Sequence, residues 1–350
     1  MRRAYSRALV AAAAASALVL SACGGDDNNS GSGSGGSSGG SVTLGFMGAQ
    51  TGPDAQLGIN ISNGVELAIE QHNAKSGASQ VKLVKYDTQG DPTQATNQAK
   101  KAITDKVVGV IGPAFSGESK TSVPILDEAG IPNVSASATA VSLAQNGWKT
   151  WHRVLANDGV QGPGDADFLA KTVGAKNMAV IDDQSEYGKG LADAVRQQLS
   201  SDGVKVAVND SIDPKASSYS STVNKVKPAN VDAIFFGGYY SAAGKLIKQL
   251  RDGGVQATFM SGDGSLDAQL ISSAGGGSAA DGVLLSCTCS SAVGSTDPAV
   301  QKFATDYKGV SKQIKFDDKG ELATDLLFIS EVKGGKLSFL GDTTQAKPSA

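Results

Sequence analysis

Short apolar or alternating runs follow one another along the chain from Val42 onward, and stretches with helical spacing separate them. In a first block this pattern predicts strands and helices in turn, and Asp91 before Pro92 is a typical helix start. The predicted strands cover 42–48, 81–87, 107–113 and 131–138, and the predicted helices cover 64–74, 91–105 and 119–130.

The same alternation of predicted strands and helices begins again after the stretch 153–157. Strands are predicted over 177–183, 205–212, 232–240, 257–264 and 282–287, and helices over 187–203, 218–230 and 242–254. Two consecutive blocks of strand–helix alternation predict an α/β protein with two doubly wound lobes, each built on a parallel sheet. Because ligands bind at the carboxyl ends of such strands, we expect a hinge and a ligand cleft between the lobes.

Residues with binding chemistry follow the predicted strands. The first block places the hydroxyls of Ser116, Ser137 and Thr139 there, and Ser116 opens a predicted helix, which suits a carboxylate. The second block places Tyr187, Tyr239, Tyr240 and Asp263 there. Any one Ser or Thr in such a place is more often a cap or loop residue. Together, however, the two sets match the two poles of a zwitterion.

The chain opens with an export signal. Arg2, Arg3 and Arg7 precede an apolar run over 8–20, which is too short to cross a bilayer because a spanning helix needs about 20 apolar residues. The run ends in Leu20-Ser21-Ala22-Cys23, which resembles the bacterial lipobox, in which the cysteine is lipidated. An ordinary signal peptide with a chance cysteine is the alternative. The Gly, Ser, Asp and Asn residues of 24–41 then predict a flexible tether with a reach of about 23 Å.

Composition limits the classes of function. The formal net charge is −3 and no basic run appears, so nucleic acid is an unsuitable partner. No second apolar run approaches the length of a membrane span. The two histidines, His72 and His152, fit no catalytic or metal-binding motif, so we expect neither an enzyme nor a cofactor. Cys287 and Cys289 could form a strained disulfide, and metal binding is less favoured; the sequence leaves this pair unassigned.

Several segments, in unbroken order between Val42 and Leu285, resemble the branched-chain amino-acid binding proteins of ABC transporters, which have the type I periplasmic-binding-protein fold. They read GAQTGPDAQLGINISNGVELAIEQHNA, YDTQGDPTQATNQAKKAI, SASAT, QSEYGKGLA, FFGGYY and FMSGDG. The resemblance implies that the ligand's carboxylate and ammonium are held by Ser116, Ser137, Thr139, Tyr187 and Asp263, and that Tyr239 and Leu57 line its apolar pocket.

This chain departs from that family pattern at three places. Asp263 stands where Glu is frequent, and Gly90 and Phe115 stand where some relatives have a disulfide. About 60 to 70 residues are absent between Lys308 and Gly309, more than a loop variation supplies. The resemblance implies that the absent stretch belongs to the first lobe and to the pocket.

The expected organisation has six parts: a signal peptide (1–22), lipidated Cys23 with its tether (23–41), lobe 1 (42–156), lobe 2 (157–286), a shortened return to lobe 1 (287–329) and a C-terminal hairpin and tail (330–350). We expect a monomer outside the cytoplasmic membrane, anchored through Cys23, that delivers a branched-chain or related amino acid to an ABC permease. A receptor of the same fold for an aliphatic amide, urea or an aromatic acid is an alternative, and so is a sensor subunit.

Overall fold

The computed structural model describes residues 40–289 and 327–349. The described residues all lie in one compact unit of the chain. The predicted signal peptide, Cys23 and the junction at Lys308–Gly309 lie outside the described residues.

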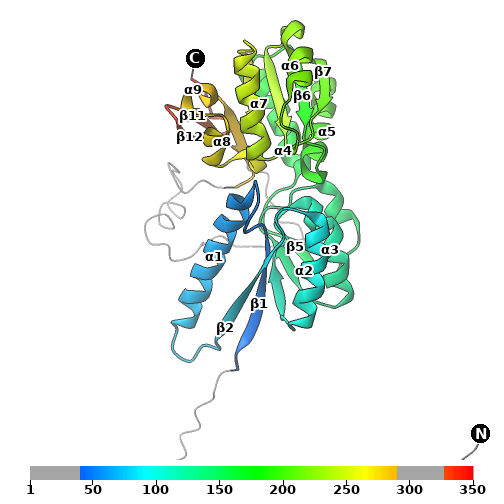
Figure 1. The fold of residues 1–350 in the computed structure, drawn as a ribbon, viewed down its shortest axis with the longest axis vertical. Coiled ribbons are helices and arrows are strands. Elements are labelled where there is room, and N and C mark those ends of the chain that lie inside the picture. The colour runs from blue at the N-terminus through cyan, green and yellow to red at the C-terminus, as the bar shows by residue number, and fades with distance from the viewer. Residues whose placement is uncertain (1–39, 290–326, 350) are drawn as a thin grey trace, which may run out of the picture. The chain divides into compact units, whose positions relative to one another are not determined.

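The first block forms a parallel five-stranded sheet within the described residues, with the strand order β2-β1-β3-β4-β5. Its strands are β1 (Val42–Gly48), β2 (Val81–Asp87), β3 (Gly109–Ile111), β4 (Asn133–Ser135) and β5 (Trp151–Arg153). The accompanying helices are α1 (Ala55–Asn73), α2 (Pro92–Thr104), α3 (Ser116–Glu128) and the short 3-10 helix η1 (Val141–Gln145). These elements run from blue through cyan to blue-green in Figure 1.

The second block forms a seven-stranded sheet with the order β12-β11-β10-β9-β8-β6-β7. Five of its strands are parallel: β6 (Asn177–Asp182), β7 (Lys205–Ser211), β8 (Ala233–Gly237), β9 (Thr258–Ser261) and β10 (Leu284–Cys287). The strands β11 (Phe328–Lys333) and β12 (Lys336–Asp342) extend it as an antiparallel hairpin. Its helices are α4 (Asp158–Asp167), the π-helical turn η2 (Phe168–Val173), α5 (Glu186–Ser201), α6 (Ser220–Val226), η3 (Lys227–Ala229), α7 (Tyr240–Asp252), η4 (Asp263–Ser265), α8 (Gln269–Ser273) and α9 (Gly277–Ala280).

The two sheets share one topology. The order β2-β1-β3-β4-β5 in the first sheet matches β7-β6-β8-β9-β10 in the second, strand for strand along the chain. In each, the order reverses beside the first strand, and ligands of such sheets bind at the carboxyl ends near that point. The prediction of two doubly wound parallel-sheet lobes is confirmed.

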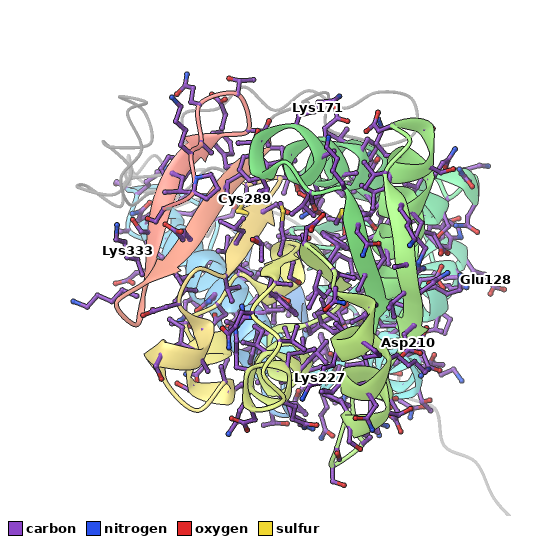
Figure 2. The ribbon with its side chains drawn as sticks, turned by 90° about the horizontal axis from the view of Figure 1, so that it is seen from above. Glu128, Lys171, Asp210, Lys227, Cys289 and Lys333 are labelled. Carbon is purple, nitrogen blue, oxygen red and sulfur yellow. A yellow bond between two sulfur atoms is a disulfide. The ribbon has the colours of Figure 1, made fainter. Side chains whose placement is uncertain are left out.

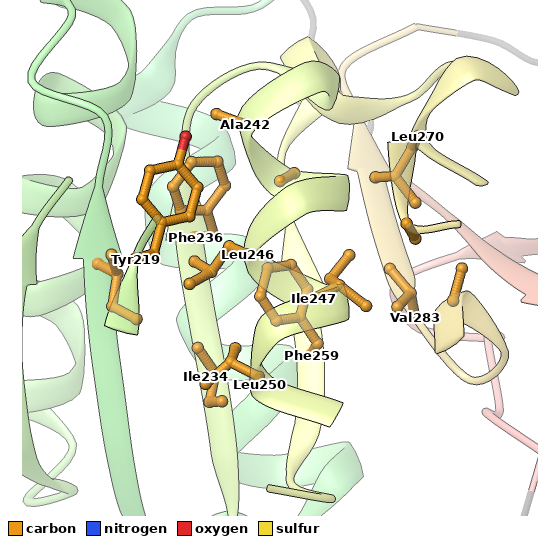
Figure 3. Packing of buried hydrophobic residues seen from close by; sticks show 14 of the residues in the cluster. Tyr219, Ile234, Phe236, Ala242, Leu246, Ile247, Leu250, Phe259, Leu270 and Val283 are labelled. Atoms are coloured by element: carbon orange, nitrogen blue, oxygen red, sulfur yellow. The ribbon is translucent and has the colours of Figure 1, made fainter. Parts of the chain in front are cut away.

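Local sequence explains most of the elements. Asp91 caps α2 as predicted, because its Oδ1 accepts hydrogen bonds from the backbone N–H of Thr93 (2.7 Å) and of Gln94 (3.1 Å). The apolar side chains of β8 and α7 pack together in the second lobe, where Ile234, Phe236 and Leu246 are fully buried. Figure 3 shows this cluster, with Leu246, Ile247 and Leu250 of α7 facing the strands.

Three predictions about the elements were wrong. Helix α1 begins at Ala55 rather than at Gly64, and neither β5 nor α4 was predicted. Helix α4 was missed because Gly159, Gly162, Pro163 and Gly164 weaken its intrinsic helix propensity. Close packing of α4 on α5 compensates for that weakness, since a Cβ on Gly162 would come within 2.5 Å of Ala194.

The expected return of 287–329 to the first lobe falls mostly outside the described residues. At its end, Phe328 and Ile329 lie in β11, and β11 pairs with β10 in the second sheet. Those two residues therefore do not belong to the first sheet, because their backbone groups complete the ladder of β10.

Candidate ligand site

A cavity of about 180 Å³ lies where residues from both lobes meet. Five of the predicted site residues line it: Leu57, Ser137, Tyr187, Tyr239 and Asp263. Phe115, Leu155 and Leu266 add apolar surface to its wall. The other two predicted residues, Ser116 and Thr139, are buried close behind this lining and do not face the cavity.

The start of α3 supplies the first-lobe side of the site. Ser116 is the first residue of α3, and its Oγ accepts a hydrogen bond of 3.2 Å from the backbone N–H of Ala140. Glu118, fully buried in the same turn, accepts hydrogen bonds from the N–H of Phe115 (3.2 Å) and from the hydroxyl of Thr88. Burial raises the pKa of Glu118 to about 7.

The turn after β4 supplies two further hydroxyls. Ser137 donates a hydrogen bond to the carbonyl oxygen of Ala114, and Ser135 fixes the turn by accepting from the N–H of Ala138 at 3.0 Å. Thr139 is fully buried, and its hydroxyl makes no hydrogen bond to another described residue.

Tyr187 and Asp263 form the centre of the second-lobe side. The Tyr187 hydroxyl donates a hydrogen bond of 2.7 Å to Oδ1 of Asp263 and accepts one of 3.0 Å from the N–H of Gly264. Burial raises the pKa of Asp263 to about 6, although the contact with Tyr187 lowers it. Near neutral pH, this site consequently presents a carboxylate.

Close packing of glycines places Tyr187. Gly188 lies so near β8 that a Cβ on it would come within 2.4 Å of the carbonyl oxygen of Gly237. Any side chain there would push the start of α5 away from the sheet. The Ser185 hydroxyl caps α5 by accepting from the N–H of Gly188 at 2.9 Å.

An aromatic cluster joins the two lobes. The ring of Tyr239 lies 4.9 Å from that of Phe115 and 5.2 Å from that of Tyr187, measured between centroids. Tyr240, which the sequence also placed near the site, does not line the cavity; its hydroxyl accepts from the N–H of Gln56 at 3.2 Å.

Three buried polar residues of α4 were missed by sequence reasoning. Asp158, Gln161 and Asp165 are spaced to lie on one face of the helix, and Gln161 and Asp165 both hydrogen-bond to Ser286 at 3.0 Å. Neither carboxylate oxygen of Asp158 makes a hydrogen bond to another described residue. Burial and the charge of Asp263 raise the pKa of Asp158 to about 8, although the positive charge of Arg153 lowers it. Asn157 before Asp158 was a helix-cap signal that could have located this face.

Asp158 lines a second cavity, of about 310 Å³, and not the first. Glu186 and Lys189 lie at its edge, and both are paired: Glu186 with Lys120 at 2.7 Å, and Lys189 with Asp193 at 2.5 Å. The charge at this edge is therefore largely compensated.

Direct contacts hold the lobes together around the first cavity. The N–H of Ser241 donates to Oδ1 of Asp54 at 3.2 Å, and Asn60 donates to Asp267 at 3.2 Å. Lys120 and Glu186 form the ion pair noted above. The site is therefore assembled from both lobes in this conformation.

Cys287 and Cys289, which the sequence left unassigned, form a disulfide and line the first cavity. Among residues 40–289 and 327–349, no group of three or more His, Cys, Asp or Glu side chains is placed to hold a metal ion. Within the same residues, no helix combines the length and apolar character needed to cross a bilayer.

Comparison with known proteins agrees with this geometry. A family profile described as periplasmic binding protein matches residues 41–319. The Leu/Ile/Val/Thr-binding protein of Salmonella typhimurium is 35% identical over 246 residues, which cover 70% of this chain and 67% of that protein. The Leu/Ile/Val-binding protein BraC3 of Rhizobium johnstonii is 34% identical over 225 residues, or 64% of this chain and 61% of that protein. The chain thus spans about two thirds of the length of these relatives.

Solved structures show the same fold. The leucine binding protein LivK from Thermotoga maritima superimposes with a TM-score of 0.80 at 25% identity, covering 86% of this chain and 98% of that chain. The branched-chain amino acid transporter substrate binding protein LivJ from Streptococcus pneumoniae, solved with isoleucine, gives a TM-score of 0.75 at 22% identity, covering 85% and 98%. The chain therefore belongs to the periplasmic binding protein family, a family of solute-binding proteins rather than enzymes, and has its type I architecture.

Proposed function

We propose that this protein captures a branched-chain or related aliphatic amino acid between its lobes and delivers it to an ABC permease. The observation that carries the proposal is a small apolar cavity with the Asp263–Tyr187 pair at one wall and Ser137 with the residues just before α3, Ala114 and Phe115, at the other. A zwitterion with an aliphatic side chain suits both walls and the apolar lining between them.

The first-lobe wall suits a carboxylate. The amides at the start of α3 carry the partial positive charge of a helix N-terminus, and Ser116, Ser137 and Thr139 add hydroxyl groups beside it. Ser116 and Thr139 are covered in this conformation, so opening of the lobes is expected to expose them.

The second-lobe wall suits an ammonium group. Asp263 offers a carboxylate that lines the cavity and is oriented by the hydroxyl of Tyr187. An ammonium placed beside this carboxylate would form a charge-assisted hydrogen bond in a buried setting, where such bonds are strongest.

The apolar residues suit an aliphatic side chain of modest size. Leu57, Leu155, Leu266 and Tyr239 line a cavity of about 180 Å³. This volume lies below the range of about 300–1,000 Å³ typical of drug-sized ligands, so a small metabolite fits better. The names of the relatives, which bind Leu, Ile, Val or Thr, agree with this size class.

An aromatic acid is a weaker candidate. Two structures with the same fold, from Rhodopseudomonas palustris, hold benzoate and 4-hydroxybenzoate. Such a ligand would bring a carboxylate into a cavity beside Asp263 without an ammonium to neutralise it.

Isothermal titration calorimetry tests the proposal with matched ligands. Leucine, isoleucine and valine should bind, whereas 4-methylpentanoate, which lacks the ammonium, and isopentylamine, which lacks the carboxylate, should bind at least about 100-fold more weakly, since each loses a charged hydrogen-bonding group. Binding of benzoate or 4-methylpentanoate at the same strength as leucine would replace the proposal with a receptor for simple carboxylic acids.

We further propose that the mature protein begins at a lipidated Cys23 and stays tethered outside the cytoplasmic membrane. The segment Leu20-Ser21-Ala22-Cys23 after a short apolar run supports the anchor, and the Gly- and Ser-rich stretch that follows would act as the tether. Such a tether would keep the binding lobes near the permease.

A further inference from the structure

The disulfide Cys287–Cys289 forms part of the wall of the ligand cavity. Both cysteines line the cavity of about 180 Å³, together with Leu57, Tyr239 and Leu266. Cys287 is 7% exposed, at the carboxyl end of β10, and Cys289 is exposed. Figure 2 shows Lys171 and Lys333 toward the outside of the view and Cys289 nearer its middle. None of the polar contacts described above uses this pair.

The loop that carries the disulfide is fixed at three points. Cys287 is held in the ladder of β10 opposite Phe328 of β11, and the S–S bond closes the loop at Cys289. Between them, buried Thr288 donates a hydrogen bond of 3.3 Å to the carbonyl oxygen of Ala156, next to the cap of α4. The sulfur atoms therefore have little freedom to move while the bond is intact.

Reduction would change the wall in a defined way. Once the bond is broken, the two sulfur atoms separate to van der Waals distance, and each side chain can rotate about its Cα–Cβ bond. The backbone of Cys287 is held in the sheet, so the exposed Cys289 has the greater freedom to move. In so small a cavity, movement of either sulfur atom alters the space left for a side chain.

We propose that the Cys287–Cys289 disulfide is a specificity-determining part of the pocket, and that it sets how large an aliphatic side chain the protein accepts. The inference rests on the proposed function, because it concerns the side-chain end of the same ligand. The oxidised pair presents a rigid, polarisable, apolar surface to that side chain. An exported protein keeps this state, since its compartment favours disulfides.

Reduction by a dithiol is a balanced two-electron step. One thiolate of the dithiol attacks a protein sulfur and breaks the Cys287–Cys289 bond, and its second thiolate then displaces the protein sulfur from the mixed disulfide. The protein gains two protons as two thiols, and the dithiol leaves as its own cyclic disulfide.

Equilibrium dialysis with labelled leucine, valine and alanine tests the inference on the full-length chain. The background change Cys23→Ser removes the other cysteine, so that every thiol effect comes from the pair. Oxidised protein is compared with protein reduced by dithiothreitol, and a thiol titration verifies two free thiols per chain. We expect the Kd for leucine to rise at least fivefold on reduction and the Kd for alanine to rise less than twofold.

A second variant separates a change of pocket shape from a general effect of the reductant. Cys287→Ala combined with Cys289→Ala removes both sulfur atoms and enlarges the cavity. Its binding should not respond to dithiothreitol, and its preference should shift toward methionine or phenylalanine relative to valine. Circular dichroism and thermal melting follow the fold of each sample.

The outcomes are distinguishable. Unchanged ratios of Kd on complete reduction, with the fold retained, would overturn the inference and leave the proposed function standing. Loss of the fold on reduction would overturn it as well, because the disulfide would then act through stability. Absence of amino-acid binding to the oxidised protein would overturn both proposals.

Discussion

The hydroxyl of Tyr187 donates a 2.7 Å hydrogen bond to Oδ1 of Asp263, and this contact joins the start of α5 to the turn after β9. The same hydroxyl accepts from the N–H of Gly264, so the tyrosine orients the acid and the turn that carries it. A carboxylate held in this way is preorganised for a cation, because it loses little freedom on binding.

Replacing this acid should weaken ligand binding far more than it affects folding. In Asp263→Asn, we expect the Kd for leucine to rise about 30-fold or more, because truncating one partner of a buried charge pair costs about 2–5 kcal/mol. The melting temperature should stay the same or rise, since a buried carboxylate with a raised pKa is removed. Calorimetry and thermal melting measure the two effects.

The matched control is Asp252→Asn. Asp252 is an exposed acid at the end of α7, where it pairs with Lys248. Its replacement should leave the Kd unchanged. Equal affinities in the Asp263→Asn variant and the control would remove Asp263 from the ligand site.

Ligand affinity should fall in acid. An ammonium binds the ionised form of Asp263, whose pKa in the ligand-free protein is raised to about 6 by burial. Below that pH, the carboxyl group must lose a proton before it can pair, so the Kd for leucine should rise about tenfold between pH 7.5 and pH 5. In the Asp263→Asn variant, the Kd for leucine should change much less over this pH range. An identical slope in both proteins would assign the titration to another group, with Asp158 as the first candidate.

The stability of the ligand-free protein should rise in acid, whereas its ligand affinity should fall. The folded pKa values of Asp158 (about 8) and Glu118 (about 7) lie above those of unfolded carboxyl groups. Such groups stabilise the folded state most fully below the unfolded pKa and lose that contribution as pH rises through the folded pKa. The melting temperature should therefore be several degrees higher at pH 5.5 than at pH 8.5.

Two variants test which groups cause this dependence of the melting temperature on pH. Asp158→Asn and Glu118→Gln remove the titrating groups one at a time, and each should reduce the difference in melting temperature between pH 5.5 and pH 8.5. A melting temperature that rises steadily from pH 5.5 to pH 8.5 in the unmodified chain would contradict the assignment of these two raised pKa values.

The ion pair between the lobes should contribute little to affinity. Lys120 and Glu186 lie 2.7 Å apart, but their side chains are 60% and 25% exposed. Exposed pairs are worth about 0–1 kcal/mol, so Lys120→Ala should raise the Kd by less than about fivefold. The effect should disappear in 0.5 M salt, and calorimetry at two salt concentrations checks it. A loss of tenfold or more would show that closure depends on this contact.

The proposed lipid anchor can be tested by the fraction of the cell in which the protein is found. Cys23→Ser should move the protein from the membrane fraction to the soluble extracytoplasmic fraction, because the lipid-bearing thiol is lost. Fractionation followed by immunoblotting measures the shift. Recovery of the unmodified protein in the soluble fraction would favour an ordinary signal peptide.

Much of the fold and of the site could be read from local sequence. The apolar run of β6 and the Asp91–Pro92 helix start act over a few residues, so their pattern survives whatever the rest of the chain does. Placement of Tyr187 and Asp263 after strands likewise follows from strand order, because carboxyl ends of parallel strands share one edge of a sheet.

Other features were decided only by tertiary structure. Helix α4 forms despite its glycines and proline because it packs closely on α5, where a Cβ on Gly162 would clash with Ala194, and because Gln161 and Asp165 hydrogen-bond with the distant Ser286. Burial also determines which predicted hydroxyls face the cavity: Ser137 does, whereas Ser116 and Thr139 lie behind it. The disulfide of Cys287 and Cys289 likewise belongs to the cavity wall only because the folded chain brings it beside residues distant in sequence, such as Leu57 and Tyr239. Local pattern specifies where the chain turns, and only long-range packing specifies which side chains meet.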